Sequence, residues 1–445
     1  MYEILSLPSS LASTYILVGL LAGSYLFYRK VAISSNDKAG KQAKRPSSRI
    51  STSASPRSSA EACQSVVSKE SEFPDNWWNG KDVFELERRA IFSKTWLYVS
   101  HRSRFTKPGD YHSLDIAGFP VFLILGKDGI VRAFHNVCRH RAYTITKKEC
   151  GSSTVLGCRY HGWSYNTRGD LIKAPHFEDV PGFDKSQNGL FEIHAHTSNY
   201  GLIFINLDAS PSVPEVDSSQ SNDFAASHGL TVDSTWVTGW TLEGAFNWKM
   251  AVKPGSFDLG NLQGCSPRSK LSGLTSLFIR TSPAGNTAKL GIFPSASLYS
   301  IQGSGLLYSL CFLPYSERKT LIRCDLYGRN QQPSSAATVS KELSRVLRDR
   351  VTEIEKGYLA EIAEIRRSKP PSMTESQYAI LLHLKTHLKL EKTLGHEVFP
   401  TLRRSTRSSK SLQADLLCKE LDCKDKLSFD TKASTTPKRN EILVW

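Results

Sequence analysis

Two short cysteine–histidine pairs constrain this chain more than any other feature of its sequence. The first pair is Cys138-Arg-His140, and after seventeen further residues the second pair follows as Cys158-Arg-Tyr-His161. Thiolates and imidazoles are common protein ligands of zinc and iron. Four such ligands in two tight pairs fit a metal centre held between two loops. The sequence therefore predicts a metal site within residues 138–161.

The order of residues within each pair separates two kinds of metal centre. Zinc accepts two thiolates and two imidazoles, although a zinc finger usually pairs CxxC with HxxxH. In a Rieske-type [2Fe–2S] cluster one iron takes two cysteines and the other takes two histidines, so each loop supplies one ligand of each kind. The flanking Gly157 and Gly162 permit a close backbone approach. We therefore predict that the cluster ligands are Cys138, His140, Cys158 and His161, with structural zinc as the alternative.

The other cysteines do not suggest a disulfide framework. Nine cysteines scattered over 445 residues indicate a reducing compartment and metal ligation. Cys150, Cys265, Cys311 and Cys324 are interpreted as plain thiols, the last two as core residues of β-rich runs.

An uncharged apolar segment opens the chain. No charged residue lies between Glu3 and Arg29, and residues 11–28 are dominated by Leu, Ile, Val, Ala, Gly and Tyr, which is just enough to span a bilayer. Basic residues follow this segment, whereas a signal peptide has them first. We predict a single-pass membrane anchor over residues 1–31, inserted through residues 4–28, with the bulk of the chain in the cytosol. The alternative is a cleaved or mitochondrial leader, against which the absence of early arginines argues.

The net charge of +15 is concentrated outside the predicted domains. Residues 29–69 contain nine Lys and Arg against Asp37 and Glu61, and a further share follows Arg403. No sequence signature of a nucleic-acid-binding fold accompanies this charge. We therefore predict a basic linker and no nucleic-acid partner.

Apolar periodicity organises the rest of the chain. A polar linker over residues 32–72 and a polar tail over 401–445 are predicted to be disordered. Between them we expect a β domain over 73–210, a boundary loop over Ser210–Ser227 and a second domain over 228–400. The expected helices cover 84–96, 338–367 and 376–394. The expected strands cover 119–125, 129–134, 154–156, 189–193, 201–206, 277–280, 298–302, 306–313 and 320–327.

The motifs CRHR, CRYHGWSY and RGDL closely resemble those of the α-subunits of Rieske non-haem iron oxygenases, especially choline-monooxygenase-like fungal members. Rieske proteins of the cytochrome bc type carry an extra disulfide cysteine in each loop, where this chain has Arg139 and Tyr160. The resemblance extends over about residues 73–400 and includes Asn247-Trp248-Lys249. It implies an α+β fold: an antiparallel β Rieske domain followed by an α+β catalytic-type domain with a central antiparallel sheet.

The resemblance breaks down at the second metal site. In the family, two histidines and a later carboxylate bind a mononuclear Fe(II) in a facial triad. The two histidine positions correspond to Gly260 and Cys265, and a bridging acidic position corresponds to Lys253. Pro and Gly occur where the family has a helix. The mononuclear iron is thus expected from the family but not supported by this sequence.

Three interpretations of that departure remain open. The first is an active oxygenase with unusual ligands, for which His383 and His387 have the spacing of one helix face; the alternative is two surface histidines. The second is a degenerate relative that keeps the cluster and has lost oxygenation. The third is a sequence that differs from the expressed protein after Val252.

Several other residues have a functional and a structural interpretation. His194 and His196 alternate along a strand and could bind metal, but exposed strand polars are the preferred interpretation. Glu353 and Glu355 lie in the helix that carries the family's third iron ligand, with a solvated helix face as the default. Trp77 and Trp78 are interpreted as packing anchors.

The resemblance implies an oxidoreductase of the monooxygenase type. It would receive electrons from a reductase, pass them through the cluster and hydroxylate or demethylate a small organic substrate, as a possible homo-oligomer. The alternative is a catalytically degenerate Rieske protein that acts only in electron transfer or without enzymatic activity.

Overall fold

The computed structural model of this protein describes residues 73–400, apart from 75, 179, 260–286, 330–335 and 366–373. The predicted anchor, linker and tail, and the strand predicted at 277–280, lie outside these residues. Among the helices of the described part, none is long and apolar enough to cross a membrane.

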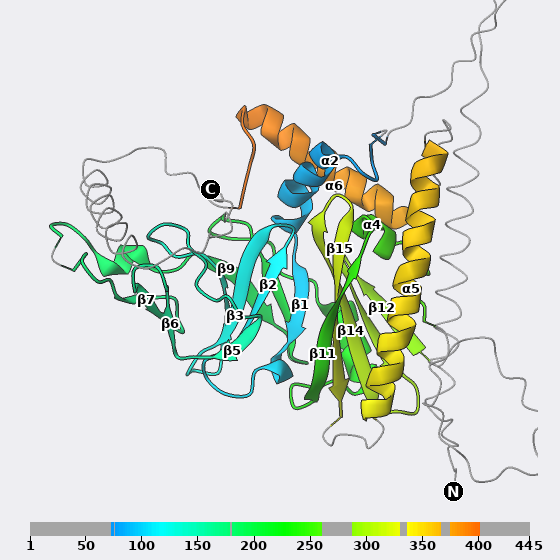
Figure 1. Ribbon diagram of the computed structural model, residues 1–445, viewed down its shortest axis with the longest axis horizontal. Helices are drawn as coiled ribbons and strands as arrows, with labels where there is room; N and C mark the ends of the chain where they lie inside the picture. Colours follow the sequence, from blue (N-terminus) through cyan, green and yellow to red (C-terminus); the bar gives the residue numbers. More distant parts are fainter. Residues whose placement is uncertain are drawn as a thin grey trace, which may run out of the picture. The chain divides into compact units, whose positions relative to one another are not determined.

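Three antiparallel sheets form the framework (Figure 1). The seven-stranded sheet has the order β1-β10-β9-β4-β3-β2-β5, and a three-stranded sheet has the order β6-β7-β8. Their strands are β1 Leu97–His101, β2 Asp110–Ile116, β3 Phe119–Leu125, β4 Val131–His135, β5 Cys150–Ser152, β6 Val155–Gly157, β7 Ser164–Asn166, β8 Leu171–Lys173, β9 Glu192–Thr197 and β10 Leu202–Asn206.

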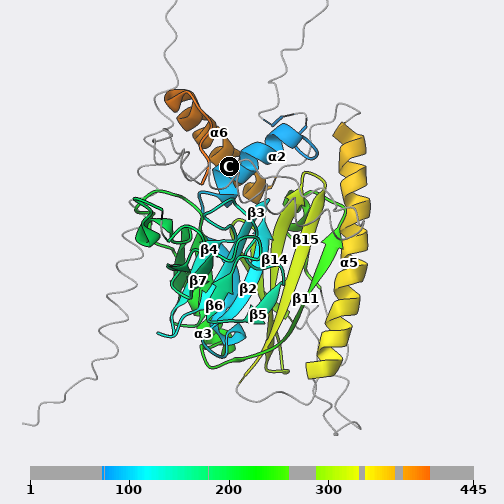
Figure 2. The same cartoon turned by 60° about the vertical axis from the view of Figure 1, so that its left-hand side comes forward.

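The third sheet comes from the C-terminal half and has the order β11-β15-β14-β13-β12. Its strands are β11 Thr235–Gly244, β12 Thr287–Ile292, β13 Ala296–Ile301, β14 Leu306–Ser316 and β15 Lys319–Gly328. The helices are α2 Lys81–Glu87, η1 Arg88–Phe92, η2 Arg102–Arg104, η3 Lys185–Asn188, α3 Ser219–His228, α4 Trp248–Ala251, α5 Ala336–Ile365 and α6 Glu375–Leu394. Figures 1 and 2 both show α5 along the five-stranded sheet, at the end of the molecule opposite to β6 and β7.

Strand β3 divides the interior into two hydrophobic cores. Its sequence FPVFLIL is apolar almost throughout, as expected for a strand buried on both faces. Val121 and Leu123 belong to the large core, which also contains the five-stranded sheet. Phe122 and Ile124 belong to a small core around the cysteine–histidine loops. Alternation along β3 therefore separates the cluster region from the rest of the fold.

The structure agrees better with the predicted types of the helices and strands than with their predicted first and last residues. The strand over 119–125 is confirmed as β3, and the long C-terminal helices are confirmed as α5 and α6. Helix α6 ends at Leu394, directly before the left-handed Gly395. The strand predicted over 189–193 begins only at Glu192, because the preceding backbone pairs with a loop instead, through Leu190 N–H and Gly169 C=O.

The boundaries of one predicted helix differ from the structure, and one predicted loop is wrong. The helix predicted over 84–96 begins at Lys81 and ends at Phe92, where the Ser93 and Thr95 hydroxyls donate to helix carbonyls and compete with its continuation. The predicted loop over 210–227 contains α3, which begins at Ser219 and ends at the left-handed Gly229. The sequence of α3 is only weakly amphipathic, so the spacing of its apolar residues did not predict a helix.

Candidate iron–sulfur site

The two predicted ligand loops have the same backbone geometry. In the first loop Cys138 N–H donates to Tyr143 C=O at 2.8 Å, and Ala142 N–H donates to Cys138 C=O at 2.9 Å. In the second loop Cys158 N–H donates to Trp163 C=O at 2.7 Å, and Gly162 N–H donates to Cys158 C=O at 3.0 Å. Each loop is thus closed on its cysteine by two hydrogen bonds that span the same number of residues.

A left-handed residue at the same place in each loop makes this closure possible. Ala142 has φ 53° and Gly162 has φ 72°. Glycine adopts this conformation freely, whereas alanine pays a steric cost. The sequence therefore indicated the left-handed position only in the second loop, which has a glycine there. The first loop has an alanine at the same place. The space at Gly162 is also tight, because an added Cβ would lie 3.3 Å from Pro175 Cγ.

These loops bring the two buried thiols together. The Cys138 thiol is hydrogen-bonded to Cys158, and this contact raises the pKa of Cys138 and lowers that of Cys158. Both thiols must be deprotonated when they bind a metal. Because the two sulfur atoms lie within hydrogen-bonding distance of each other, they can bind the same iron.

Tyr165 on β7 orients the thiol of Cys138. Its Oη lies 3.2 Å from Cys138 Sγ and accepts a hydrogen bond from Arg139 N–H at 3.1 Å. Because the hydroxyl oxygen already accepts from Arg139, its own proton is available to the sulfur. Burial raises the pKa of Tyr165, and the neighbouring Cys138 raises it further. A neutral hydroxyl therefore donates toward the ligand sulfur.

The two imidazoles form a second pair. The His140 and His161 ring centroids lie 4.6 Å apart. Trp163 stacks on His140 at 5.1 Å with an interplanar angle of 10°, and Phe177 lies edge-on to it at 4.9 Å. Trp163 and Phe177 are both buried in the small core. These rings fix the orientation of His140 and exclude water from one side of the pair.

The donor set fits a two-iron cluster better than a single ion. The four predicted ligands meet as a cysteine pair and a histidine pair. A tetrahedral zinc site needs all four ligands around one centre, whereas a Rieske cluster needs this division.

The chain after Asn247 is ordered but differs from an iron-binding helix. Asn247 caps α4 by accepting from Lys249 N–H at 3.0 Å, and α4 ends at Ala251. Turns follow, and Arg350 on α5 donates to the carbonyl of Gly255 at 2.6 Å. Gly260 and Cys265, which correspond to the family's histidine positions, lie outside the described residues.

Two lysines of this segment are held by carboxylates and tryptophans. Lys249 is fully buried with its Nζ 2.5 Å from Glu87 Oε1, and it lies over the Trp77 ring at 4.7 Å. Lys253 pairs with Glu361 and lies 4.8 Å from the Trp78 ring. Trp77 and Trp78 are buried, which confirms them as packing anchors. The fold thus holds the positive charge of Lys253 in place through an ion pair and an aromatic ring.

The predicted surface location is wrong for His387. It is 5% exposed, and its Nε2 lies 3.1 Å from Glu391 Oε1, which in turn binds Arg89. His383 stacks on Phe293 with centroids 5.2 Å apart. The helical pattern of α6 did not reveal that Arg89 of η1, about three hundred residues earlier in the chain, binds Glu391, the partner of His387.

The remaining candidates have structural partners. Glu353 pairs with Arg350, and Glu355 accepts from Ala245 N–H at 2.8 Å. Cys311 and Cys324 are buried in β14 and β15, as predicted, and Cys150 is an exposed free thiol. Cys265 lies outside the described residues.

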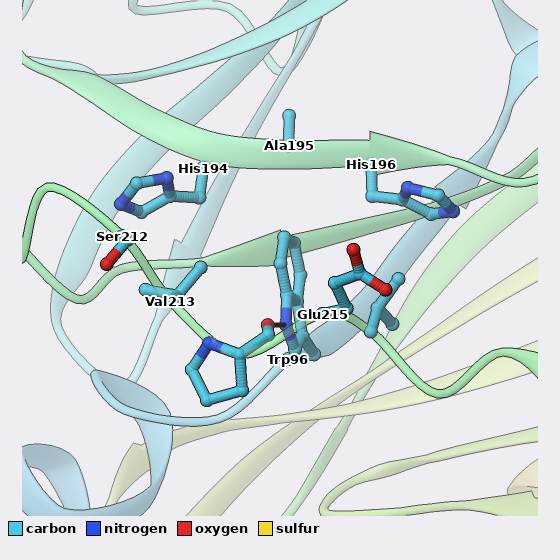
Figure 3. Close-up of a pocket in the computed structure, with 9 residues that line it drawn as sticks. Trp96, His194, Ala195, His196, Ser212, Val213 and Glu215 are labelled. Atoms are coloured by element: carbon cyan, nitrogen blue, oxygen red, sulfur yellow. Dashed lines mark hydrogen bonds between the residues drawn. The ribbon is translucent and has the colours of Figure 1, made fainter.

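His194 and His196 line a pocket of about 530 Å³ together with Trp96 and Glu215 (Figure 3). His194 Nε2 is hydrogen-bonded to Ser210 C=O at 2.8 Å, and His196 is exposed beside Trp96. Both histidines were predicted to be exposed polar residues of a strand. This describes His196, which is exposed, better than His194, which is half-buried.

Part of this chain matches a known domain family, and the chain is similar in sequence to known oxygenases. Residues 95–184, which include all four predicted ligands, match the Rieske [2Fe-2S] domain family. The chain is 32% identical over 184 residues to the carnitine monooxygenase oxygenase subunit of Acinetobacter baumannii, covering 40% of this chain and 48% of that protein. It is 31% identical over 190 residues to the chlorobenzene dioxygenase α-subunit of Cupriavidus sp., covering 41% of each.

Solved structures share the fold over a longer range. The apo form of the quaternary ammonium Rieske monooxygenase CntA aligns with a TM-score of 0.55 at 24% identity, over 71% of this chain and 93% of that one. Naphthalene 1,2-dioxygenase from Rhodococcus sp. aligns with a TM-score of 0.53 at 18% identity, over 72% and 94%. These likenesses confirm the predicted two-domain α+β fold. In sequence, the chain spans about half the length of the curated relatives that it matches.

Proposed function

Because this chain contains a Rieske [2Fe–2S] domain and is homologous to Rieske non-haem iron oxygenases, we propose that it is an oxidoreductase of that class. It receives electrons from a reductase into a cluster bound by Cys138, His140, Cys158 and His161. It uses them to hydroxylate or demethylate a small organic substrate.

The observation that carries this proposal is the pairing of the four side chains on two equivalent loops. When bound, the cluster supplies one-electron chemistry, with a potential raised by its two imidazole ligands. The protein contributes the Tyr165 hydroxyl beside one ligand sulfur and the Trp163 and Phe177 rings beside the histidines. These groups orient the ligands and limit their contact with water.

The names of the similar proteins suggest which substrates to test first. Carnitine monooxygenase and the quaternary ammonium monooxygenase CntA act on methylated ammonium compounds by name, and chlorobenzene dioxygenase acts on an aromatic ring. We propose a methylated amine of the choline or carnitine type, in line with the motif resemblance to choline-monooxygenase-like proteins.

A second candidate function is electron transfer without oxygenation. Lys253 favours it, because a positive charge held by Glu361 and Trp78 occupies the position of the family's bridging carboxylate. In the same segment Phe257 is fully buried, and its ring centroid lies 4.8 Å from that of Phe312. The fold therefore accommodates the residues at which this segment differs from the family.

Iron content and oxygen consumption separate the two functions. The full chain is purified anaerobically, its iron is counted, and O₂ uptake with a reductase is followed with and without choline and carnitine. Three irons per chain and substrate-dependent uptake with hydroxylated or demethylated product support the oxygenase. Two irons and no substrate-dependent uptake exclude it and leave the electron carrier.

We also propose that residues 4–28 tether the chain to a membrane with the bulk of it in the cytosol. The support is the uncharged apolar segment followed by basic residues. Deleting residues 1–32 should move the protein from the membrane pellet to the supernatant without changing its visible spectrum. Full-length protein in the supernatant would contradict the tether.

A further inference from the structure

A pocket outside the candidate iron–sulfur site lies between β9 and the segment 212–216, which precedes α3. It has a volume of about 530 Å³, and Trp96, His194, His196 and Glu215 line it (Figure 3). Its described lining contains none of the four predicted cluster ligands. Pockets of about 300–1,000 Å³ are typical of small-molecule sites. This one is called the β9 pocket below.

Hydrogen bonds hold the walls of the β9 pocket in place. Trp96 Nε1 donates to the carbonyl of Pro214 at 2.7 Å, and His194 Nε2 donates to the carbonyl of Ser210 at 2.8 Å. Ser210 N–H donates in turn to Asp208 Oδ1 at 3.0 Å, which fixes the start of the segment. A ligand therefore finds a preformed pocket and loses little free energy in ordering it.

The β9 pocket carries a negative charge in a basic chain. Glu215 is exposed and, within the part of the chain that the structure describes, takes part in no ion pair or side-chain hydrogen bond. Lys94, two residues before Trp96, is held by Asp208 at 2.8 Å instead. The chain as a whole has a net charge of +15. An unneutralised carboxylate at the pocket therefore attracts a cation that the rest of the chain repels.

An indole ring lies beside that carboxylate. Figure 3 shows the Glu215 carboxylate and the His196 ring on the same side of Trp96. The centroids of Trp96 and His196 lie 6.5 Å apart with an interplanar angle of 73°. The indole N–H already donates to Pro214, so the ring offers a ligand its π face. Tryptophan attracts cations more strongly than the other aromatic side chains. The carboxylate and the indole thus favour the same kind of ligand.

The remaining lining groups indicate the shape of the cation. His194 donates through Nε2, so in the neutral imidazole Nδ1 is an acceptor. Ser212 adds a hydroxyl, and Val213 and Val216 add apolar surface. Acceptors beside a carboxylate favour an ammonium group that carries N–H donors. The valines favour a short apolar body on that ammonium group.

We propose that the β9 pocket binds a small primary alkylammonium compound. The ammonium group lies between the Glu215 carboxylate and the Trp96 ring, and the apolar body lies along Val213 and Val216. Binding is reversible, and no covalent bond forms or breaks. This goes beyond the proposed function, because neither the cluster nor a mononuclear iron takes part. Failure of either proposal would therefore leave the other standing.

The test uses the full chain with fluorotryptophan at its eight tryptophans and follows them by fluorine NMR. Trp96→Phe identifies the resonance of Trp96. The probe is isopentylamine, a cation at neutral pH, and its control is isopentyl alcohol, which has the same carbon skeleton without the charge. The amine should shift the Trp96 resonance in a saturable way, and the alcohol should bind at least about fivefold more weakly. Choline, whose nitrogen carries no N–H, should also bind more weakly than the amine.

A matched pair of variants locates the charge that matters. Glu215→Gln removes the carboxylate of the β9 pocket. Glu192→Gln removes an exposed carboxylate on the same strand, which lines a neighbouring pocket instead. Both change the net charge equally. Glu215→Gln should raise the Kd for isopentylamine about fivefold at low salt, and Glu192→Gln much less. High salt should reduce the difference between them.

Three results would overturn the proposal. The first is a Trp96 resonance that isopentylamine does not shift. The second is equal binding of the amine and either the alcohol or choline, which would remove the ammonium assignment. The third is an equal effect of Glu215→Gln and Glu192→Gln, which would show that the carboxylate of the pocket is not the binding group. If Trp96→Phe did not fold, calorimetric Kd values for the wild type and the two glutamine variants would decide the question.

Discussion

The cluster region and the C-terminal half hold their polar groups in place by different means. Around the ligands, the two loops are closed by backbone hydrogen bonds within six consecutive residues and packed by a small core of their own. In the C-terminal half, Lys249 depends on Glu87, and Asp325 depends on Arg104, both far away in sequence. The first region is built locally and separately, whereas the second depends on a few long-range buried charges within one large core.

This difference predicts that the cluster can be lost without unfolding the protein. Cys138→Ser and His161→Ala should each abolish the visible absorption and the rhombic low-g EPR signal, since each removes a ligand from one iron. The large core does not contain either residue, so the far-ultraviolet circular dichroism spectrum should persist. Cys150→Ser, at an exposed thiol, is the control and should keep the full signal. A normal EPR spectrum in His161→Ala would remove it from the ligand set.

Breaking the buried ion pair of the C-terminal half should have the opposite effect, on stability. Glu87→Ala leaves the fully buried Lys249 ammonium without its carboxylate and removes the partner of Trp248 Nε1. Loss of one partner of a buried pair costs about 3–5 kcal/mol. Urea unfolding measures this loss in free energy.

Two controls sharpen that result. Glu87→Leu with Lys249→Met removes both charges and should restore part of the stability. Glu243→Ala breaks the exposed pair with Lys319 and should cost less than about 1 kcal/mol. If Glu87→Ala were no more harmful than Glu243→Ala, the importance of long-range buried charge would be refuted.

A smaller effect is expected from the hydroxyl beside the cluster sulfur. Tyr165→Phe removes a donor 3.2 Å from Cys138 Sγ, and this hydrogen bond favours the reduced, more negative cluster. A hydrogen bond worth about 0.5–1.5 kcal/mol corresponds to a fall in potential of about 20–60 mV, at about 59 mV per tenfold change for one electron. A redox titration measures it, with Tyr143→Phe as the control. A raised potential in Tyr165→Phe would show that the hydroxyl does not donate to the sulfur.

The smallest predicted effect concerns the left-handed residue of each loop. Ala142→Gly removes the steric cost at φ 53° and should stabilise the loop by about 0.5–1 kcal/mol. Gly162→Ala should act in the opposite direction, because it adds a Cβ near Pro175 at φ 72°. The temperature at which the visible spectrum bleaches reports both changes. If the two substitutions shifted it in the same direction, the loops would not be equivalent.

The same contrast explains what the sequence could predict. Two short motifs carry the four predicted ligands, and the fold pairs the two cysteines and the two histidines. Strand β3 and helices α5 and α6 were also found, because their periodicity is local and strong. Tyr165 and Ala142 were missed although they lie in or beside the quoted motifs. Their roles depend on which way a strand faces and on the sign of a backbone angle.

The C-terminal half was harder to predict because its important contacts are long-range. Nothing local to Lys249 indicates Glu87, and nothing local to Glu391, the partner of His387, indicates Arg89. The predicted loss of the facial triad rests on Lys253, Gly260 and Cys265, of which only Lys253 lies in the described part of the chain. Its ion pair with Glu361 is a fact of the fold that the sequence alone did not suggest.

The measurement that tests this account most directly is metal and sulfide analysis of the full chain purified without oxygen, combined with EPR after reduction. The account predicts at least two irons and two acid-labile sulfides per chain, with a rhombic low-g signal from a cluster bound by two cysteines and two histidines. A colourless protein that contains one zinc and no labile sulfide would contradict it.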